Sequence, residues 1–157
     1  MSNEMYLTPG HLLRRAHQIA ATISAEELAD LGLTTVQYTT LVSVHDNPGI
    51  DITALSGLVA YDRSTLGGVL DRLEEKKLIE RKAADSDKRV RLLYTTRQGG
   101  KLANDSVAAS LRAQERILGP LGAGERAQLT RLLAKLIRLQ THNLPASVRI
   151  VMERVAG

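Results

Sequence analysis

The chain has 157 residues, 43% hydrophobic and 24% charged, so it has the size of one compact domain and is too apolar to be disordered throughout. It has no cysteine, which excludes disulfides, thiolate metal sites and cysteine redox switches, and with tyrosine as its only aromatic residue the core must be built from Leu, Ile, Val and Ala. No apolar run reaches the roughly 18 residues of a membrane span and no signal-peptide pattern occurs, which predicts a cytoplasmic protein without a membrane partner.

The net charge of +4 is distributed unevenly along the chain. Residues 1–61 carry six acidic and two basic side chains, whereas residues 76–101 carry nine basic and three acidic ones. A local cluster of positive charge is typical of proteins that bind the phosphate backbone of nucleic acids, although such clusters also occur as solvated faces. Charge alone leaves both interpretations open.

The first third of the sequence predicts two helices. Thr8 and Pro9 are residue types that begin a helix, and Gly32 is one that ends it. The spacing of four apolar residues predicts that one face of this first helix, from Thr8 to about Asp30, is buried: Leu12, Ala16, Ile19 and Ile23. Thr34 and Gln37 form a capping-box pattern that opens a second helix, which ends at the turn of residues 46–49.

Two further helices follow, joined by a tight turn. The first is short, from about Thr53 to Ala60. Asp62 then caps a fourth helix from about Arg63 to Lys77, and the helical spacing of four residues predicts its buried stripe: Leu66, Val69, Leu70 and Leu73.

The pattern then changes from helical to extended. Residues 79–82 and 89–95 read as two strands separated by a polar loop, which predicts a β-hairpin with a charged tip. One long helix is expected from about Thr96 to Leu118, and a break at residues 119–122 separates it from a last helix from about Glu125 to His142. The fold class is therefore mainly α with a small β-hairpin, and the order of elements is that of a winged helix-turn-helix.

The fourth helix would be the one that reads DNA, because the second helix of such a pair enters the major groove. Its outer face carries small or polar residues in place of bulky apolar ones: Arg63, Ser64, Gly67, Gly68, Asp71 and Arg72. A glycine inside a helix costs about 1 kcal/mol relative to alanine, so Gly67 and Gly68 require a reason. Close approach of DNA and close packing against a neighbouring helix both supply one.

Five motifs, in order, resemble the multiple antibiotic resistance regulator (MarR) family over most of the chain. They are residues 33–38 (LTTVQY), residues 62–65 (DRST), Leu73-Glu74 with Leu78-Ile79, residues 87–89 (DKR) and Thr96 to Gly99. The resemblance implies a single domain over residues 1–157 that acts as a homodimer on a pseudo-palindromic DNA operator. Dimerisation helices would span about 8–31 and 100–157, and the winged helix-turn-helix about 34–99.

The same resemblance implies roles for individual residues. Asp87 at the tip of the hairpin would orient Arg89, which would enter the minor groove, where narrow grooves attract arginine. The full set of expected DNA contacts is Arg63, Ser64, Thr65, Gly67, Gly68, Arg72, Asp87, Lys88, Arg89 and Arg91. Lys77 departs from the family pattern, which usually has glycine there, and Thr95 replaces a common leucine.

A pocket for a small effector is also implied, where the first two helices meet the helix after the hairpin. The residues there would be His11, Arg14, Arg15, Gln18 and Tyr38. Arginine beside His and Tyr fits an aromatic carboxylate, through a forked ion pair and ring contacts, although surface arginines and an interface histidine explain the same residues. Residues 9–15 resemble the branch of the family that controls catabolism of aromatic or N-heteroaromatic acids.

Other classes of function are favoured less by the sequence. It has no phosphate-binding glycine loop, nucleophile elbow or metal-ligand spacing, so neither an enzyme nor a cofactor or metal site is expected. The main function predicted is a repressor that a small aromatic acid releases from its operator. The alternative is a DNA-binding architectural protein that needs no ligand, or a protein-interaction adaptor.

Overall fold

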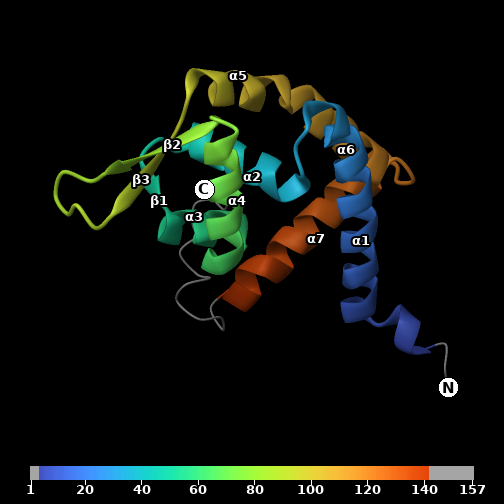
Figure 1. Ribbon diagram of the computed structural model, residues 1–157. Coiled ribbons are helices and arrows are strands. Elements are labelled where there is room, and N and C mark those ends of the chain that lie inside the picture. Colours follow the sequence, from blue (N-terminus) through green and yellow to red (C-terminus); the bar gives the residue numbers. More distant parts are fainter. Residues whose placement is uncertain (1–3, 142–157) are drawn as a thin grey trace.

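The computed structural model describes residues 4–141 and has the expected fold class: helices with one small sheet (Figure 1). The N-terminal helices are a 3-10 turn (Glu4–Leu7), α1 (Pro9–Leu28), a second 3-10 turn (Ala29–Leu31) and α2 (Thr35–Asp46). Strand β1 (Ile50–Asp51), α3 (Ile52–Val59) and α4 (Arg63–Glu75) follow. The hairpin is β2 (Ile79–Ala83) and β3 (Arg91–Thr95), and α5 (Arg97–Asp105), α6 (Val107–Leu118) and α7 (Ala123–Thr141) complete the fold. No helix within residues 4–141 combines the length and apolar character of a bilayer span.

The helix starts form as the capping residues predict. Thr34 accepts a hydrogen bond from the backbone N–H of Gln37 (3.2 Å), and the Gln37 side chain accepts one from the N–H of Thr34 (3.3 Å), so the capping box is confirmed. Thr96 caps α5 and also ties it to the hairpin. Its hydroxyl accepts from Gly99 N–H (3.0 Å) and donates to the carbonyl of Lys77 (2.7 Å). These caps satisfy backbone donors that the first turn of a helix leaves unpaired.

One apolar core lies where α2, α3, α4 and the sheet meet. Most of its side chains are leucines with almost no exposed surface, among them Leu41, Leu55, Leu66, Leu70, Leu73 and Leu93. Burial of a leucine side chain contributes roughly 1.5–3 kcal/mol, so this body is the stable part of the chain. The α4 stripe is confirmed, with Val69 half-buried and the other three members fully buried.

One strand was not predicted, and three predicted details of the fold are wrong. Strand β1 was not predicted, because two residues show no periodicity; Gly49, with φ of +84°, turns the chain so that Ile50 pairs with Leu93 in the sheet order β1-β3-β2. The second hairpin strand begins at Arg91 and not at Arg89, since residues 84–90 form the tip.

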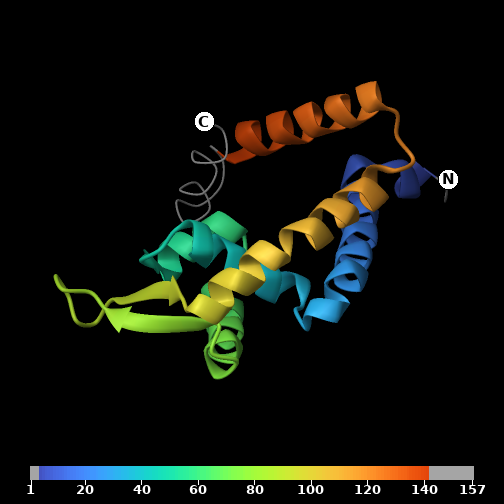
Figure 2. The ribbon, with the colours of Figure 1, turned by 90° about the horizontal axis from the view of Figure 1, so that it is seen from above.

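The expected long helix is two helices, which meet at Ser106. The buried Ser106 hydroxyl donates to the carbonyls of Leu102 (2.6 Å) and Ala103 (2.9 Å). Such bonds from a serine to the preceding turn compete with the helical ladder and bend helices. As a result α5 packs on α2, whereas α6 runs along α1 (Figure 2).

The expected buried face of α1 is the third correction. Leu12 and Ile19 are 48% and 58% exposed, Ala16 is exposed, Ile23 is half-buried, and Leu28 is the one α1 residue that is fully buried. On the far side of the molecule α7 has no extensive contact with any other described element, and Figure 2 shows it standing apart from α1 and α6. The apolar stripes of α1 and α7 are therefore uncovered in a single chain. The predicted end of the last helix, His142, lies outside the described residues.

Candidate nucleic-acid interface

The turn between α3 and α4 is fixed by a short set of hydrogen bonds. Ala60, with φ of 57°, ends α3 in the left-handed conformation, and the Ser56 hydroxyl donates to the Tyr61 carbonyl across the turn (2.7 Å). Asp62 then caps α4, accepting from the Thr65 N–H (2.8 Å) and the Thr65 hydroxyl (2.7 Å). These bonds to Thr65 lower the pKa of Asp62 below its ordinary 3.8. A lowered pKa stabilises the fold at pH above that ordinary value, and the stabilisation is lost as the pH falls through the lowered pKa.

Helix α4 turns its leucines inward and leaves a polar face open. The sequence-predicted contacts Arg63, Ser64, Thr65, Gly68 and Arg72 are exposed on α4, and Gly67 is half-buried. The Thr65 hydroxyl donates to Asp62, so its proton is engaged in the cap and its oxygen is left to accept. The predicted residues of α4 are thus brought to one helix, with the Asp62 cap at its start.

Nothing in the described part of the chain explains why glycine occupies positions 67 and 68 of α4. No atom outside their own helix backbone lies within 4 Å of a Cβ built on Gly67 or on Gly68, and neither residue has a positive φ. Close packing against a neighbouring helix, which the sequence left open, is therefore excluded for the described residues. The explanation that the sequence leaves is close approach of DNA to the α4 backbone, which stays a prediction.

The hairpin projects away from the helices as a wing (Figure 1). Lys88 and Arg89 of its tip and Arg91 at the start of β3 are exposed to solvent, and within residues 4–141 no carboxylate lies at salt-bridge distance from Arg89 or Arg91. Lys88 pairs with Asp85 at 3.3 Å. Asp87 accepts a hydrogen bond from the backbone N–H of Arg89 (2.9 Å), so in this structure it fixes the turn and does not hold the guanidinium.

Some cations of the basic segment form ion pairs within the molecule, and others do not. Arg81 forms ion pairs with Asp71 and Glu74 of α4 at 2.6 and 3.0 Å. Lys82 pairs with Glu80 (2.7 Å), and its ammonium lies 5.0 Å from the centre of the Tyr94 ring. The pair with Glu80 raises the pKa of Lys82 above its ordinary 10.5. Among the described residues, the exposed cations of residues 76–101 that have no ion pair or side-chain hydrogen bond are Lys77, Arg89, Arg91 and Arg97, and the outer face of α4 adds Arg63 and Arg72.

The expected effector residues are not gathered into a cavity. Arg14, Arg15 and Gln18 are exposed on α1, and Arg15 reaches only Gln18, at 3.5 Å. His11 packs edge-on against Tyr6 with ring centres 5.3 Å apart, whereas Tyr38 lies half-buried against the core. Their assignment stays a prediction.

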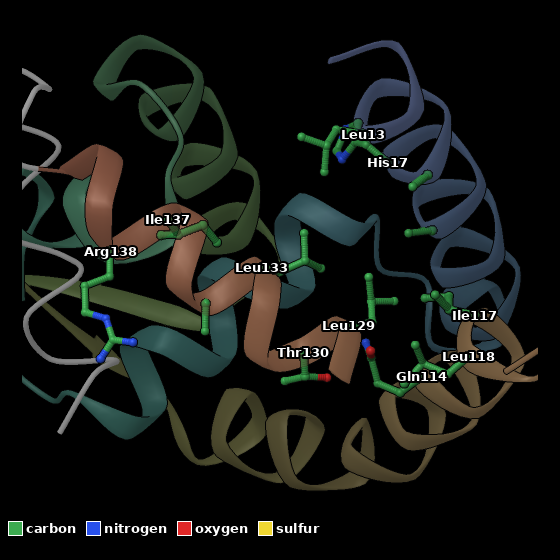
Figure 3. Close-up of a pocket in the computed structure, with 13 residues that line it drawn as sticks. Leu13, His17, Gln114, Ile117, Leu118, Leu129, Thr130, Leu133, Ile137 and Arg138 are labelled. Carbon is green, nitrogen blue, oxygen red and sulfur yellow. The ribbon is translucent and has the colours of Figure 1, made fainter. Parts of the chain in front are cut away.

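A cavity that the sequence did not indicate lies between α1, α6 and α7, with a volume of about 770 Å³ (Figure 3). It is lined mainly by apolar side chains, among them Leu13, Ile117, Leu129, Leu133 and Ile137, with His17, Gln114, Thr130 and Arg138 as its polar members. Its α1 side consists of residues 13, 16, 17 and 20, whose helical spacing was the available signal. The stripe predicted from the sequence, residues 12, 16, 19 and 23, shares only Ala16 with this lining.

Comparison with known proteins gives relatives over most of the chain. Residues 33–90 match the profile of the MarR family. The transcriptional repressor NicR of Pseudomonas putida is 30% identical over 82% of this chain and 81% of its own length. The Bordetella bronchiseptica regulator BpsR, described with regulation of DNA binding by 6-hydroxynicotinic acid, superposes with a TM-score of 0.79 at 29% identity, covering 83% of this chain and 94% of BpsR.

A DNA complex is also among the similar structures. The repressor CouR, solved on a 23-mer duplex, superposes with a TM-score of 0.79 at 26% identity and covers 87% of this chain and 96% of CouR. The sequence-level expectation of the family and of the winged fold is thus confirmed, and the relatives named are transcriptional regulators, which are not enzymes. This chain belongs to the MarR family of transcriptional regulators.

Proposed function

We propose that the protein is a homodimeric repressor that binds a pseudo-palindromic operator through α4 and the wing of each copy, and that a small aromatic or N-heteroaromatic carboxylic acid releases it. The observation that best supports DNA binding is the uncovered backbone at Gly67 and Gly68 of α4, beside exposed arginines that have no described ion pair. Small residues admit the edge of a duplex, and free guanidiniums offer charge to phosphates or to a narrow minor groove.

The proposed homodimer explains the uncovered apolar faces. Leu129, Leu132, Leu136 and Leu139 of α7 are 37–59% exposed, and Leu12, Leu13 and Ile19 of α1 are 42–58% exposed. Exposed apolar surface of this extent on neighbouring helices favours association. A second copy that packs its own α1 and α7 against the cavity between α1, α6 and α7 would cover both apolar faces. These helices lie in the regions expected to dimerise (8–31 and 100–157).

Release by an acid is supported by the relatives rather than by a built site in this chain. BpsR is described with 6-hydroxynicotinic acid, and NicR is a repressor. We assign the carboxylate contact to Arg15, with His11, Arg14, Gln18 and Tyr38 around it. A second copy against α1 would enclose Arg14, Arg15 and Gln18, which a single chain leaves in solvent.

The proposed function is tested by operator binding at several salt concentrations, with DNA from beside the protein's own gene. Affinity for a paired site, with half-sites about 10–10.5 bp apart, should fall steeply as salt rises, because bound cations displace phosphate counterions. Arg89→Ala should weaken binding at least tenfold and reduce the salt dependence by about one ion, while the thermal midpoint stays unchanged because the wing tip is outside the core. Arg131→Ala, an exposed arginine of α7, is the control and should bind as wild type.

A shallow salt dependence, or wild-type binding by Arg89→Ala, would contradict the assignment of the wing. Binding that is equally strong on unrelated duplexes would favour the architectural alternative over an operator-specific repressor.

A further inference from the structure

Arg81 lies in the basic segment of the chain, yet its guanidinium is engaged inside the molecule. It stands in the middle of β2, opposite Leu93, and reaches across to α4. One nitrogen lies 2.6 Å from a carboxylate oxygen of Asp71, and the other lies 3.0 Å from a carboxylate oxygen of Glu74. Asp71 and Glu74 are three residues apart on one face of the helix, so a single planar fork spans both.

This contact joins the two parts that would meet DNA. Strand β2 leads directly into the wing tip, and α4 carries the open glycine face. The angle between β2 and α4 decides whether both parts reach one duplex together. In the described residues Arg81 is the one side chain of β2 that forms ion pairs with α4.

The contact also changes the charge that α4 presents. Within residues 63–75 there are three acidic side chains and two basic ones, so the helix alone is net negative. Asp71 and Glu74 keep 62% and 41% of their side-chain surface exposed, and without a partner they would repel the phosphates of a nearby duplex. The Arg81 side chain is only 28% exposed, and turning it toward DNA would leave both carboxylates unpaired.

We propose that Arg81 is a positioning residue for DNA recognition, which braces the wing strand against the recognition helix and neutralises Asp71 and Glu74 without contacting DNA itself. The inference rests on the proposed function. It separates Arg81 from the free arginines of the same segment, Arg89 and Arg91, which carry the contacts.

The test compares operator affinity and its salt dependence in Arg81→Met and Arg89→Ala. Arg81→Met should lose about tenfold in affinity, within the range of coupling measured between contacting residues. Both variants remove positive charge near the phosphates, so in both the slope of log affinity against log salt should become shallower, and the slope alone does not separate a neutralising arginine from a contacting one. Arg126→Met is the matched control: Arg126 is 30% exposed and pairs with Glu115 at 2.8 Å, away from the wing, so this variant should bind as wild type.

A double-mutant cycle then asks whether Arg81 acts through its two partners. In a chain that already carries Asp71→Asn and Glu74→Gln, adding Arg81→Met should change affinity less than twofold, because nothing remains to brace or neutralise. If Arg81→Met fails to fold, Arg81→Lys takes its place, with a smaller loss that also vanishes in this background, since one ammonium cannot span both carboxylates.

Two results would overturn the inference while the proposed function stood: wild-type affinity in Arg81→Met, or an equal loss in both backgrounds. Absence of DNA binding by the wild-type protein would instead count against the proposed function.

Discussion

Two adjacent glycines in the middle of a helix lower its stability by about 1 kcal/mol each relative to alanine. Gly67 and Gly68 occupy such positions in α4, where neither a positive φ nor a neighbouring atom calls for glycine. The sequence could show that these residues needed an explanation. The two explanations were close approach of DNA and close packing against a neighbouring helix. Only the structure could exclude packing for the described residues, because packing depends on where the other helices lie.

We therefore expect Gly67→Ala and Gly68→Ala to have opposite effects on stability and on binding. Each should raise the free energy of unfolding by roughly 0.5–1 kcal/mol in urea titrations, because alanine is the better helix former. Each should also weaken operator binding at least tenfold, since a methyl group would stand where the duplex approaches. Gly124→Ala, which also has open space around it but lies at the start of α7, should leave DNA affinity unchanged. Equal operator affinity in all three variants would show that the pair does not contact DNA.

At the end of α4 the backbone has a conformation that glycine adopts more easily than the lysine found there. The N–H of Lys77 donates to the carbonyl of Glu74 (2.8 Å) and that of Leu78 to the carbonyl of Leu73 (2.9 Å), which is the Schellman pattern. Lys77 has φ of 57°, a left-handed conformation in which a β-carbon costs roughly 1–2 kcal/mol. The glycine usual in the family would avoid that cost, so lysine at this position should lower the free energy of unfolding by a measurable amount.

Lys77→Gly should accordingly raise the free energy of unfolding by about 1 kcal/mol. Lys77→Ala is the control, because it removes the same charge but keeps the β-carbon, and its stability should stay near that of wild type. Urea denaturation of the three proteins provides the comparison. A gain in Lys77→Ala as large as in Lys77→Gly would point to charge rather than to backbone conformation.

Elements with local signals could be predicted from sequence, and those set by distant contacts could not. The Thr34–Gln37 box and the Asp62 and Thr96 caps each require a partner three residues away, so a short window contains them. The bend at Ser106 depends on the serine being buried, which no short stretch of sequence reveals.

The same distinction between local and distant signals holds at the site. Arg63 and Arg89 could be proposed as DNA contacts from motifs, and these assignments stay predictions, whereas the ion pairs of Arg81 join residues of different elements and required the fold.

At the scale of the whole molecule, the apolar faces of α1 and α7 would link effector binding to DNA binding in the proposed homodimer. Arg15 lies on α1, so an acid held there in the proposed homodimer would act on the helices that set the spacing of the two wings. A ligand shifts such an equilibrium only through different affinities for its two states. The acid must therefore bind best to the spacing that does not fit the operator.

Arg15→Ala should keep operator affinity and lose release by the acid. A charge-assisted pair contributes about 1.5–3 kcal/mol, so the variant should need roughly 10–150 times more acid. Titration of the protein–operator complex with a panel of aromatic and N-heteroaromatic carboxylic acids measures both proteins side by side, with 6-hydroxynicotinic acid included. If no acid releases the wild-type protein, or if Arg15→Ala responds equally, the effector site is elsewhere.

The separation of α1, α6 and α7 from the α4–wing surface has a genetic consequence. A chain with a damaged wing tip would keep the helices through which we propose that two copies pair, and it should therefore still combine with intact chains. In a cell producing both kinds in equal amounts, mixed pairs would outnumber fully intact ones and would hold an operator by one half only. Loss-of-function alleles in the wing are thus expected to be dominant over the wild-type gene, whereas alleles that remove α7 should be recessive.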